Sequence, residues 1–326
     1  MVAEAPEDDL QLEATVPETY EGARLDVVCA KLFDAYSRAR LQTWIDAGRL
    51  LVNGEVVTRQ RQPVAAGDHL LLDAEAEEDL RILPQDLPLT VVHADRDIAI
   101  IAKQAGLTTH PGAGQRDQTL QNALLFHFPQ TASVPRAGIV HRLDKDTSGL
   151  LVVALNLKAH AKLVAELGRR EFRREYDAIV QGELIAGGTV DAPIGRHPRE
   201  RLRMAVVDHG GREAVTHYRV HERFDRHTWL RVRLETGRTH QIRVHLAHLR
   251  YPIIGDGLYG APVRCAGMAP ELRELLQHFP RQALHARELE LTHPRSGKRQ
   301  GWTLDPPADI QQLLTQLRAH TQAMTG

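Results

Sequence analysis

The residues of this chain best suited to acid–base or nucleophilic chemistry gather in one short polar loop. Residues 138–154 read GIVHRLDKDTSGLLVVA, in which two apolar runs flank a polar stretch that contains His141, Arg142, Asp144 and Asp146. Rigid elements that present a short polar loop are where catalytic and binding groups concentrate. A loop aspartate is also a common turn-former or solvated charge, so composition alone does not choose between Asp144 and Asp146.

A group of histidines raises the alternative of metal chemistry. The segment THQIRVHLAH contains His240, His245 and His248. This H-x4-H-x2-H spacing does not place all three on one face of a helix, and no glutamate completes the HExxH arrangement of zinc hydrolases. Cys29 and Cys265 lie far apart, which indicates neither a zinc site nor a disulfide framework. We therefore expect no metal site.

The distribution of charge favours a polyanionic partner more than the total charge does. The net charge of −1 hides six acidic residues and no lysine or arginine in residues 1–20, and thirteen arginines against six acidic residues in residues 195–250. A polyanion responds to the local field, and guanidinium groups bind phosphates and base edges in forks. A solvated, arginine-rich surface is the other interpretation of the same pattern.

Two groups of predicted elements would position these residues. In the first, residues 22–33 and 37–48 show helical spacing of apolar residues, a hairpin turns at Asn53-Gly54, and residues 64–73 contain a further strand. From Leu89 onward, strands and helices alternate without a break that would mark a domain boundary. In this second group we expect strands at residues 97–101, 149–155, 175–183 and 228–235, and helices at residues 156–168 and 308–321. Leu157, Val164 and Leu167 would form the packing face of the first of these helices.

The first group of elements resembles the αL RNA-binding module of a small-subunit ribosomal protein, which also occurs in tyrosyl-tRNA synthetases and in many RNA-modifying enzymes. The resemblance covers about residues 21–75 and rests on RLD, SRAR, GRLLVNG and a closing GD. It implies that Arg38, Arg40 and Arg49, which stay off the apolar stripe of the second helix, contact RNA. A small adaptor with an incidentally basic helix is the other interpretation.

The polar loop resembles the signature of the RluA-type family of RNA pseudouridine synthases, through HRLDKDTSG. The same resemblance continues in RREFRREYDAIVQGEL, GGTVDAPIGRHP, LETGRTHQIRVHLAHLRYPIIGDGLYG and RQALHA, and it runs over almost the whole chain. Within the family, the chain is most similar to members that modify the RNA of the large ribosomal subunit. One departure is that Lys103 precedes Gln104 where the family usually has Lys-Pro, which puts the rigidity of that loop in doubt rather than the chemistry.

The resemblance implies a role for each matching residue. Asp144 corresponds to the essential carboxylate, Arg243 to the arginine that pairs with it, and Tyr176 to the active-site tyrosine. Ile242 and Leu246 correspond to apolar groups that line the uracil pocket.

Two residues of the polar loop are expected to contact the substrate. Arg142 is implied to fill the space that a flipped-out nucleotide leaves, and His141 stands beside it. Flipping costs a few kcal/mol, and loop uridines are easier to extrude than paired ones. A stem-loop substrate is therefore favoured.

Physical chemistry is consistent with these roles. On a helix that begins near Thr239, Ile242 and Leu246 share a face and Arg243 points about 100° away, so an apolar wall and a charge can reach one cleft. Burial would favour a neutral Asp144, and a fork of donors from Arg243 opposes this. The Tyr176 ring can stack on uracil, a contact worth about 1–3 kcal/mol, whereas a phenol with a pKa of ~10 is a poor base at neutral pH. Periodicity alone would make Arg243 a surface residue and Tyr176 a core residue.

The reaction that the resemblance implies breaks the N1–C1′ bond of uridine, turns the uracil and rejoins it through C5. It involves no redox change or group transfer, so no cofactor is expected. The expected partner is large-subunit (23S) ribosomal RNA, free or in a pre-ribosomal particle, with the target uridines in a stem-loop at the subunit interface. The alternative is a non-catalytic RNA-binding ribosome-assembly factor.

We predict an α+β protein with a flexible acidic tail (residues 1–20), a small αL RNA-binding domain (21–75), a linker (76–88) that follows the charged EAEED segment, and a catalytic domain (89–326). The catalytic domain is expected to have the pseudouridine synthase fold, a mixed, mostly antiparallel central sheet with flanking helices and a catalytic cleft. No window is apolar enough for a membrane span, and the acidic N-terminus lacks the regions of a signal peptide. We therefore expect a cytoplasmic protein without a membrane partner that acts as a monomer.

Overall fold

The computed structural model describes residues 10–34, 36, 38–74, 82–112, 115–200, 203–263 and 266–325. The chain divides into two compact units, residues 1–81 and 82–326. Both units combine helices with strands, which confirms the predicted α+β class. The first part of the predicted acidic tail, the EAEED segment and Cys265 lie outside the described residues.

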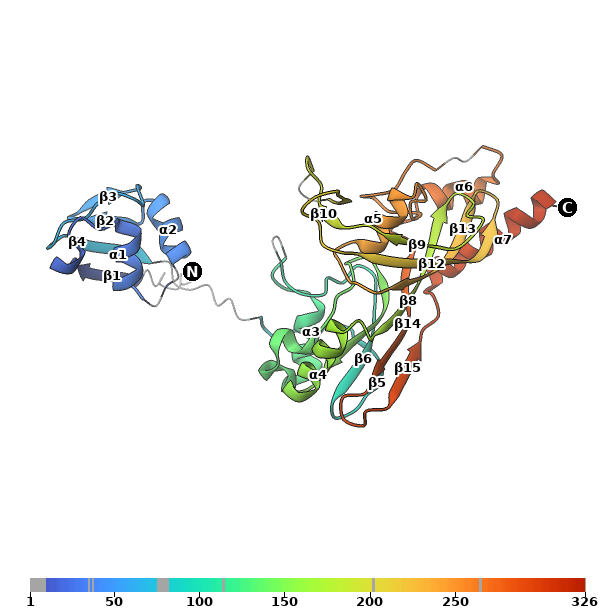
Figure 1. Ribbon diagram of the computed structural model, residues 1–326, viewed down its shortest axis with the longest axis horizontal. Coiled ribbons are helices and arrows are strands. Elements are labelled where there is room, and N and C mark those ends of the chain that lie inside the picture. Colours follow the sequence, from blue (N-terminus) through green and yellow to red (C-terminus); the bar gives the residue numbers. More distant parts are fainter. Residues whose placement is uncertain are drawn as a thin grey trace, which may run out of the picture. The chain divides into compact units, whose positions relative to one another are not determined.

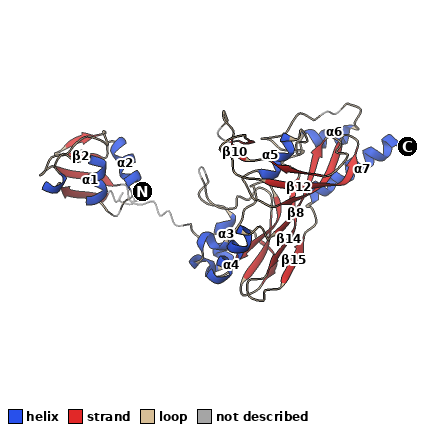
Figure 2. Cartoon of the chain, viewed as in Figure 1, coloured by secondary structure: helices blue, strands red, loops and turns tan. Residues whose placement is uncertain are grey.

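The first unit packs two helices against a four-stranded antiparallel sheet (Figures 1 and 2). Its elements are β1 (Leu10–Thr15), η1 (Glu18–Tyr20), α1 (Leu25–Leu32), α2 (Arg38–Asp46), β2 (Leu50–Val52), β3 (Glu55–Val57) and β4 (His69–Ala74), with the strand order β1-β4-β2-β3. The hairpin turn predicted at Asn53-Gly54 is confirmed, because both residues have the positive φ (53° and 84°) that a type I′ turn requires. Leu41, Trp44 and Ile45 of α2 are buried in the core of this unit.

The predicted boundary between a flexible tail and this unit at residue 20 is wrong. Strand β1 pairs with β4, with Leu12 opposite Leu72 and Ala14 opposite Leu70. Leu12 and Ala14 pack against the core, whereas Glu13 is exposed. The segment therefore has the two-residue period of a half-buried strand, which the overall acidity of residues 1–20 concealed.

The second unit is built on a nine-stranded sheet with the order β5-β6-β7-β14-β8-β13-β12-β9, and β15 pairs with β14. Only the β7–β14 pair is parallel, so the prediction of a mixed, mostly antiparallel sheet is confirmed. The strands of this sheet are β5 (Thr90–Ala94), β6 (Ile98–Lys103), β7 (Ser148–Ala154), β8 (Arg173–Gln181), β9 (Gly188–Asp191), β12 (Val215–Phe224), β13 (His227–Leu234), β14 (Leu284–Thr292) and β15 (Arg299–Thr303). A separate pair is formed by β10 (Ile194–Arg196) and β11 (Met204–Val206).

Helices gather at the two ends of this sheet (Figure 1). Those near β5, β6 and β7 are α3 (Leu120–His127), η2 (Pro129–Ser133), η3 (Pro135–Gly138) and α4 (Leu157–Gly168). Those near β12 and β13 are α5 (Gln241–His248), α6 (Pro270–Gln277) and α7 (Ala308–Thr325). None of the described helices is long and apolar enough to cross a membrane.

Strands β6 and β7 are buried on both faces, so alternate residues feed two different cores. Ala99 and Ile101 of β6 belong to one core, and Ile98 and Ile100 belong to the other. The first core contains Tyr176, Ile242 and Leu246 of α5, and the buried apolar residues of α7. Burial on both faces explains why these strands read as continuous apolar runs in the sequence.

The predicted linker, residues 76–88, extends too far. Residues 82–88 bind to α3: the Asn122 side chain donates to the carbonyl of Leu83 (2.8 Å), and the amide of Gln85 donates to the carbonyl of Asn122 (3.0 Å). The ring of His127 lies 2.8 Å from the carbonyl of Leu87. Because helix groups bind its backbone, this stretch is part of the second unit.

The predicted packing face of α4 is wrong at two of its three residues, since only Leu167 packs against a core. Leu157 and Val164 are exposed, whereas Leu163 lies in the core. The inward face carries Glu166, which is buried because Arg299 (3.0 Å) and a backbone amide bind its carboxylate. Because Glu166 lies on the buried side of α4, the opposite side of this helix appeared more apolar in the sequence.

Candidate active site

The polar loop, residues 141–147, is held in place by its own backbone carbonyls. The carbonyls of residues 143–146 all accept hydrogen bonds from groups of the second unit. Thr109 Oγ1 donates to the carbonyl of Leu143 (2.8 Å), and Thr147 N donates to that of Asp144 (3.0 Å). The carbonyl of Lys145 accepts from Lys103 Nζ (2.8 Å) and Gly106 N (3.0 Å), and that of Asp146 accepts from Arg281 Nη1 (3.1 Å). A loop fixed at four consecutive residues presents the side chain of Asp144 in one orientation.

Lys103 connects two loops. Its ammonium donates to the carbonyls of Gln104, Leu107 and Lys145, at 2.8–2.9 Å, and it is 2% exposed. Burial lowers the pKa of Lys103 to about 7, but the three carbonyls provide one acceptor for each hydrogen of the ammonium. The segment that carries Gln104 in place of the usual proline is therefore tied to the polar loop through Lys103.

Glycine at position 149 brings strand β14 beside the polar loop. Gly149 pairs with Ala286 in the parallel β7–β14 contact and has a φ of 120°. A Cβ at this position would lie 2.2 Å from the carbonyl oxygen of Ala286. The close approach places Leu284, on the same strand, in the wall of the cavity that contains Asp144.

The structure brings Arg243 of α5 to Asp144, 99 residues earlier in the chain. Arg243 Nη1 donates to Asp144 Oδ2 at 3.1 Å. Along another edge of the guanidinium, Nε (2.7 Å) and Nη2 (2.8 Å) donate to Asp256. The side chains are 9% (Arg243), 17% (Asp144) and 0% (Asp256) exposed. Burial works against the charge of Arg243, but the two carboxylates outweigh it and raise the pKa of the guanidinium.

Asp256 is the main residue of this site that sequence reasoning missed. Burial opposes its ionisation, but the bonds from Arg243 prevail and lower the pKa of the carboxyl. It also accepts the backbone amides of Leu258 (2.9 Å) and Tyr259 (3.0 Å). Its segment, GDGLYG, belonged to the family resemblance, so an acidic residue between two glycines was the available signal.

A cavity of about 530 Å³ opens at Asp144. Apolar side chains of Leu143, Ile242 and Leu284 line it together with Tyr176. Leu246, which the resemblance placed in the uracil pocket, does not line it: its side chain is fully buried in the main core. The apolar wall thus comes from the polar loop and β14 as well as from α5.

Tyr176 lies on β8 with only 5% of its surface exposed, and it lines the cavity. Burial raises the pKa of its phenol; the charge of Arg174 opposes this shift, and the charge of Asp144 adds to it. The hydroxyl is therefore protonated at neutral pH, and the ring offers a fixed apolar surface beside Asp144.

The other two predicted loop residues differ in exposure. Arg142 is exposed at the cavity, with Nη1 3.5 Å from the ring of His110. His141 lines the cavity with a ring that packs edge-on against Phe172, and its Nε2 accepts the amide of Val152 at 3.2 Å. Burial, followed by the charge of Arg174, lowers the pKa of His141 to about 3, so the ring is neutral.

The three histidines that suggested metal chemistry do not converge. Both ring nitrogens of His245 lie at 2.9 Å from protein oxygens, those of Thr216 and Ala192. His240 Nδ1 lies 2.9 Å from the hydroxyl of Tyr259, whose ring lies under the guanidinium of Arg243 at 5.0 Å. His245 and His240 therefore support α5 and the Arg243 side chain.

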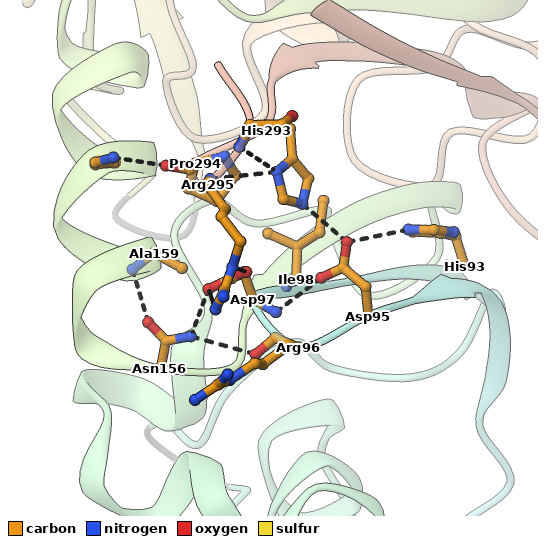
Figure 3. Close-up of polar contacts among 12 residues, drawn as sticks. His93, Asp95, Arg96, Asp97, Ile98, Asn156, Ala159, His293, Pro294 and Arg295 are labelled. Atoms are coloured by element: carbon orange, nitrogen blue, oxygen red, sulfur yellow. Dashed lines mark hydrogen bonds and ion pairs between the residues drawn. The ribbon is translucent and has the colours of Figure 1, made fainter. Parts of the chain in front are cut away.

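Among the described residues, one group has metal-like spacing, formed by Asp95, Asp97 and His293 (Figure 3). Its oxygens are already bound by protein donors. Asp95 accepts two backbone amides (2.7 and 2.9 Å) and lies 2.8 Å from His293, whereas Arg295 forms a two-bond pair with Asp97. The group ties the β5–β6 turn to the segment after β14, and a guanidinium in this position opposes a cation.

The arginines predicted to contact RNA lie in the first unit. Arg38 is exposed, but it also donates to the fully buried carboxylate of Asp26 (2.7 and 3.2 Å). The guanidinium of Arg40 lies 4.9 Å from the ring centre of Trp44. Arg49 is partly exposed at the end of α2. Two of the three therefore help to hold α2 as well as presenting charge.

Comparison with known proteins adds two kinds of similarity. The chain matches the family described as RNA pseudouridylate synthase over residues 97–248 and the S4 domain over residues 23–70. It is 53% identical to ribosomal large subunit pseudouridine synthase D of Pseudomonas aeruginosa, across 98% of this chain and 99% of that protein. It is 51% identical to the protein of the same name from Escherichia coli, across 95% of each chain.

Solved structures show the same fold. Human RNA pseudouridylate synthase domain containing 4 superimposes with a TM-score of 0.56 at 24% identity, over 70% of this chain and 93% of that chain. Human RNA pseudouridylate synthase domain containing 1 gives a TM-score of 0.53 at 27% identity, over 72% and 96%.

Proposed function

The chain belongs to the RNA pseudouridylate synthase family and is an RNA pseudouridine synthase, and from that premise we propose that it converts specific uridines of large-subunit ribosomal RNA to pseudouridine with Asp144 as the catalytic carboxylate. The rRNA substrate follows from the names of relatives that are similar over nearly the whole chain. The observation that carries the assignment of Asp144 is its contact with a buried guanidinium beside the apolar wall of the cavity. Family membership argues against a non-catalytic assembly factor.

Asp144 would act through the oxygen that Arg243 leaves available. Arg243 binds only Oδ2, and no described side chain donates to Oδ1. Attack on C1′, addition to the uracil and removal of a sugar proton all require an ionised oxygen aimed at the nucleotide. Asp144 supplies that oxygen, and the N1–C1′ bond breaks. C5 then bonds to C1′, the C5 proton leaves to solvent, and N1 takes up a proton, so that product and substrate are isomers.

The apolar walls would hold the detached uracil between these steps. Tyr176 offers its ring for stacking, and Ile242 and Leu143 limit the room in which the uracil can turn. A neutral phenol is a weak base, so Tyr176 acts as a stacking surface for the uracil ring and not as the base that takes the C5 proton. His141, neutral and half-buried, contributes to the same wall.

Arg142 would take the place of the everted nucleotide. It is exposed beside the cavity and two residues from Asp144. A stem-loop at the subunit interface is the proposed substrate, because loop uridines are less costly to extrude. Arg38, Arg40 and Arg49 of the S4 domain would add contacts to the RNA backbone.

Release of tritium from large-subunit rRNA that carries [5-³H]uridine tests this proposal. The wild type should release tritium, and Asp144→Asn should release none over multiple turnovers while it retains RNA binding. Asp146→Asn is the matched control, because Asp146 lies in the same loop but does not line the cavity, and it should retain activity. Multiple turnover by Asp144→Asn would contradict the assignment.

Two further measurements separate the alternatives. Activity that is unchanged by EDTA argues against a metal hydrolase. Mapping of pseudouridines in rRNA from cells with and without the protein identifies the target positions. If no position in large-subunit rRNA depends on the protein, the proposed substrate is contradicted.

A further inference from the structure

Four arginines besides Arg142 and Arg243 line the cavity that contains Asp144. We call this part of the lining the basic arm, and its arginines are Arg136, Arg170, Arg174 and Arg238. Arg170 and Arg238 bind Glu213, through its carboxylate and its backbone carbonyl respectively. Arg174 differs from the other three, because its side chain lies deep in the wall.

Arg174 is a buried cation without a counter-charge. It is 6% exposed, and none of the ion pairs of the described residues includes it. Its Nε is buried and has no hydrogen-bond partner among the described residues, and its Nη2 makes one long bond, 3.4 Å, to the carbonyl of Glu235. Burial lowers the pKa of the guanidinium. A cation of this kind is costly to keep in the free protein, which points to an anion that joins it on binding.

The surroundings keep this guanidinium in position. Arg174 lies two residues before Tyr176 on β8, so both side chains point to the same face of the strand and both line the cavity. A Cβ at Gly237 would lie 3.0 Å from Arg174 Nη1, so the loop after β13 makes room for it. The carboxylate of Glu235, which also lines the arm, is occupied by His217 and lies 3.9 Å from Arg170.

His141 adds a second buried donor to the same region. Its Nε2 accepts a backbone amide, so the hydrogen of the neutral ring is on Nδ1, and Nδ1 has no partner among the described residues. Arg174 is near enough for its charge to act on the His141 ring. His141 Nδ1 and Arg174 Nε are thus two buried donors without acceptors on residues that line one cavity, and together with the arginines of that lining they favour an oxyanion.

We propose that Arg174 binds a backbone phosphate next to the everted uridine and so anchors the RNA strand in the basic arm. The inference rests on the proposed function, because it identifies how the same cavity holds its substrate. A phosphate fits better than a uracil carbonyl, since only a full negative charge compensates a buried guanidinium. The free protein thus retains an unpaired cation that its substrate neutralises.

The test replaces single phosphates of a target stem-loop by uncharged methylphosphonates and measures binding to full-length wild type and Arg174→Met. In the wild type, one substitution beside the target uridine should weaken binding about 10- to 100-fold, as for a lost hydrogen bond to a charged group. Arg174→Met should bind the unmodified RNA with a similar loss and should show no further loss with that methylphosphonate. It should also reduce the slope of log affinity against log salt by about 0.7–1.

Arg173→Met is the matched control. Arg173 is the preceding residue on β8 and pairs with Glu288 and Glu290 on the other face of the strand. This variant should respond to every methylphosphonate as the wild type does. Because Arg174 has no counter-charge, the midpoint of thermal unfolding of Arg174→Met without RNA should equal or exceed that of the wild type.

Three results would overturn the inference. If each methylphosphonate weakens binding equally in the wild type and in Arg174→Met, the arginine contacts the base and not a phosphate. A marked fall in the unfolding midpoint of Arg174→Met would make it a structural residue. A wild type that is insensitive to every methylphosphonate would remove the site altogether. Absence of tritium release by the wild type would instead contradict the proposed function, and the binding results would still decide the role of Arg174.

Discussion

Asp256→Asn tests whether the geometry around Asp144 depends on a residue that does not line its cavity. Asp256 binds Arg243 through two hydrogen bonds and accepts two backbone amides. Asparagine has nearly the same shape, but it carries one acceptor oxygen and replaces the other by a donor. That donor would face either an N–H of Arg243 or a backbone amide, so the substitution breaks the pair without creating a cavity.

The expected loss of stability follows from the burial of the pair. Asp256 has no exposed side-chain surface and Arg243 has 9%. Removing one partner of such a pair costs about 3–5 kcal/mol in the free energy of unfolding. For a unit of this size, each kcal/mol corresponds to about 2–4 °C, so the unfolding midpoint should fall by about 6–20 °C. Because total stability is about 5–15 kcal/mol, the folded fraction of the variant is measured at 25 °C and kcat is expressed per folded molecule.

The catalytic loss follows from the freedom that Arg243 gains. Only Nη1 contacts Asp144, and the orientation of the guanidinium comes from Asp256. Loss of one charged hydrogen bond in the transition state, about 1.5–3 kcal/mol, corresponds to a fall in kcat of about 10- to 100-fold. RNA affinity should stay within about twofold, because binding surfaces are unchanged.

Thermal unfolding and single-turnover tritium release at 25 °C measure the two effects. Asp97→Asn is the control, since Asp97 also forms a two-bond pair with an arginine, Arg295, outside the cavity (Figure 3). Arg295 is 54% exposed, so the loss of stability should be smaller than in Asp256→Asn. Asp97→Asn should lower the unfolding midpoint without changing kcat. The reasoning is refuted if Asp256→Asn keeps the wild-type kcat per folded molecule, or if Asp97→Asn loses activity to the same extent.

Three further predictions concern the ring, the sheet and the first unit. Tyr176→Leu should weaken RNA binding by about 1–3 kcal/mol through lost stacking, whereas Tyr176→Phe should bind within about twofold in the same anisotropy assay. Gly149→Ala should lower the free energy of unfolding in urea by about 2–4 kcal/mol, because its Cβ meets a β14 carbonyl. Gly168→Ala should raise this free energy by about 0.5–1 kcal/mol, because Gly168 lies at the end of α4 with open space around it. Burial of Asp26 is outweighed by hydrogen bonds from two arginines and a glutamine, which lower its pKa from 3.8 to about 2. The stabilising contribution of Asp26 should therefore be present above about pH 4 and lost as the pH falls through about 2. Tryptophan fluorescence of the first unit should report this loss in the wild type and not in Asp26→Asn.

Local periodicity predicted the elements whose environment is uniform. The apolar runs of β6 and β7 are buried, and the helix predicted at residues 308–321 is α7. It failed where charge and burial disagree. Strand β1 carries an acidic outer face, and α4 turns Glu166 toward the interior because Arg299 is there to pair with it. Such a partner, 133 residues later in the chain, is invisible to any local window.

The candidate site was predictable only in part, for a similar reason. The resemblance pointed to Asp144, Tyr176 and Arg243, and these three lie around one cavity. It misplaced Leu246, because helical spacing alone does not tell which of two neighbouring apolar residues faces the cavity and which faces the core. Asp256 and Arg174 were missed because their significance depends on partners, or on the lack of a partner, that only the folded chain reveals.

The arrangement of Arg243 explains how one arginine can serve a reactive carboxylate without blocking it. A guanidinium that bound Asp144 with two parallel hydrogen bonds would occupy both carboxylate oxygens and hold them away from substrate. Asp256 takes the Nε and Nη2 donors at 2.7 and 2.8 Å, so that only Nη1 remains for Asp144, at 3.1 Å. The cluster of two carboxylates and one guanidinium has a net charge of −1, and the more exposed Asp144 is the member that can share this charge with a nucleotide. The fully buried aspartate therefore stabilises the cation, and it also leaves one oxygen of its partner available for chemistry.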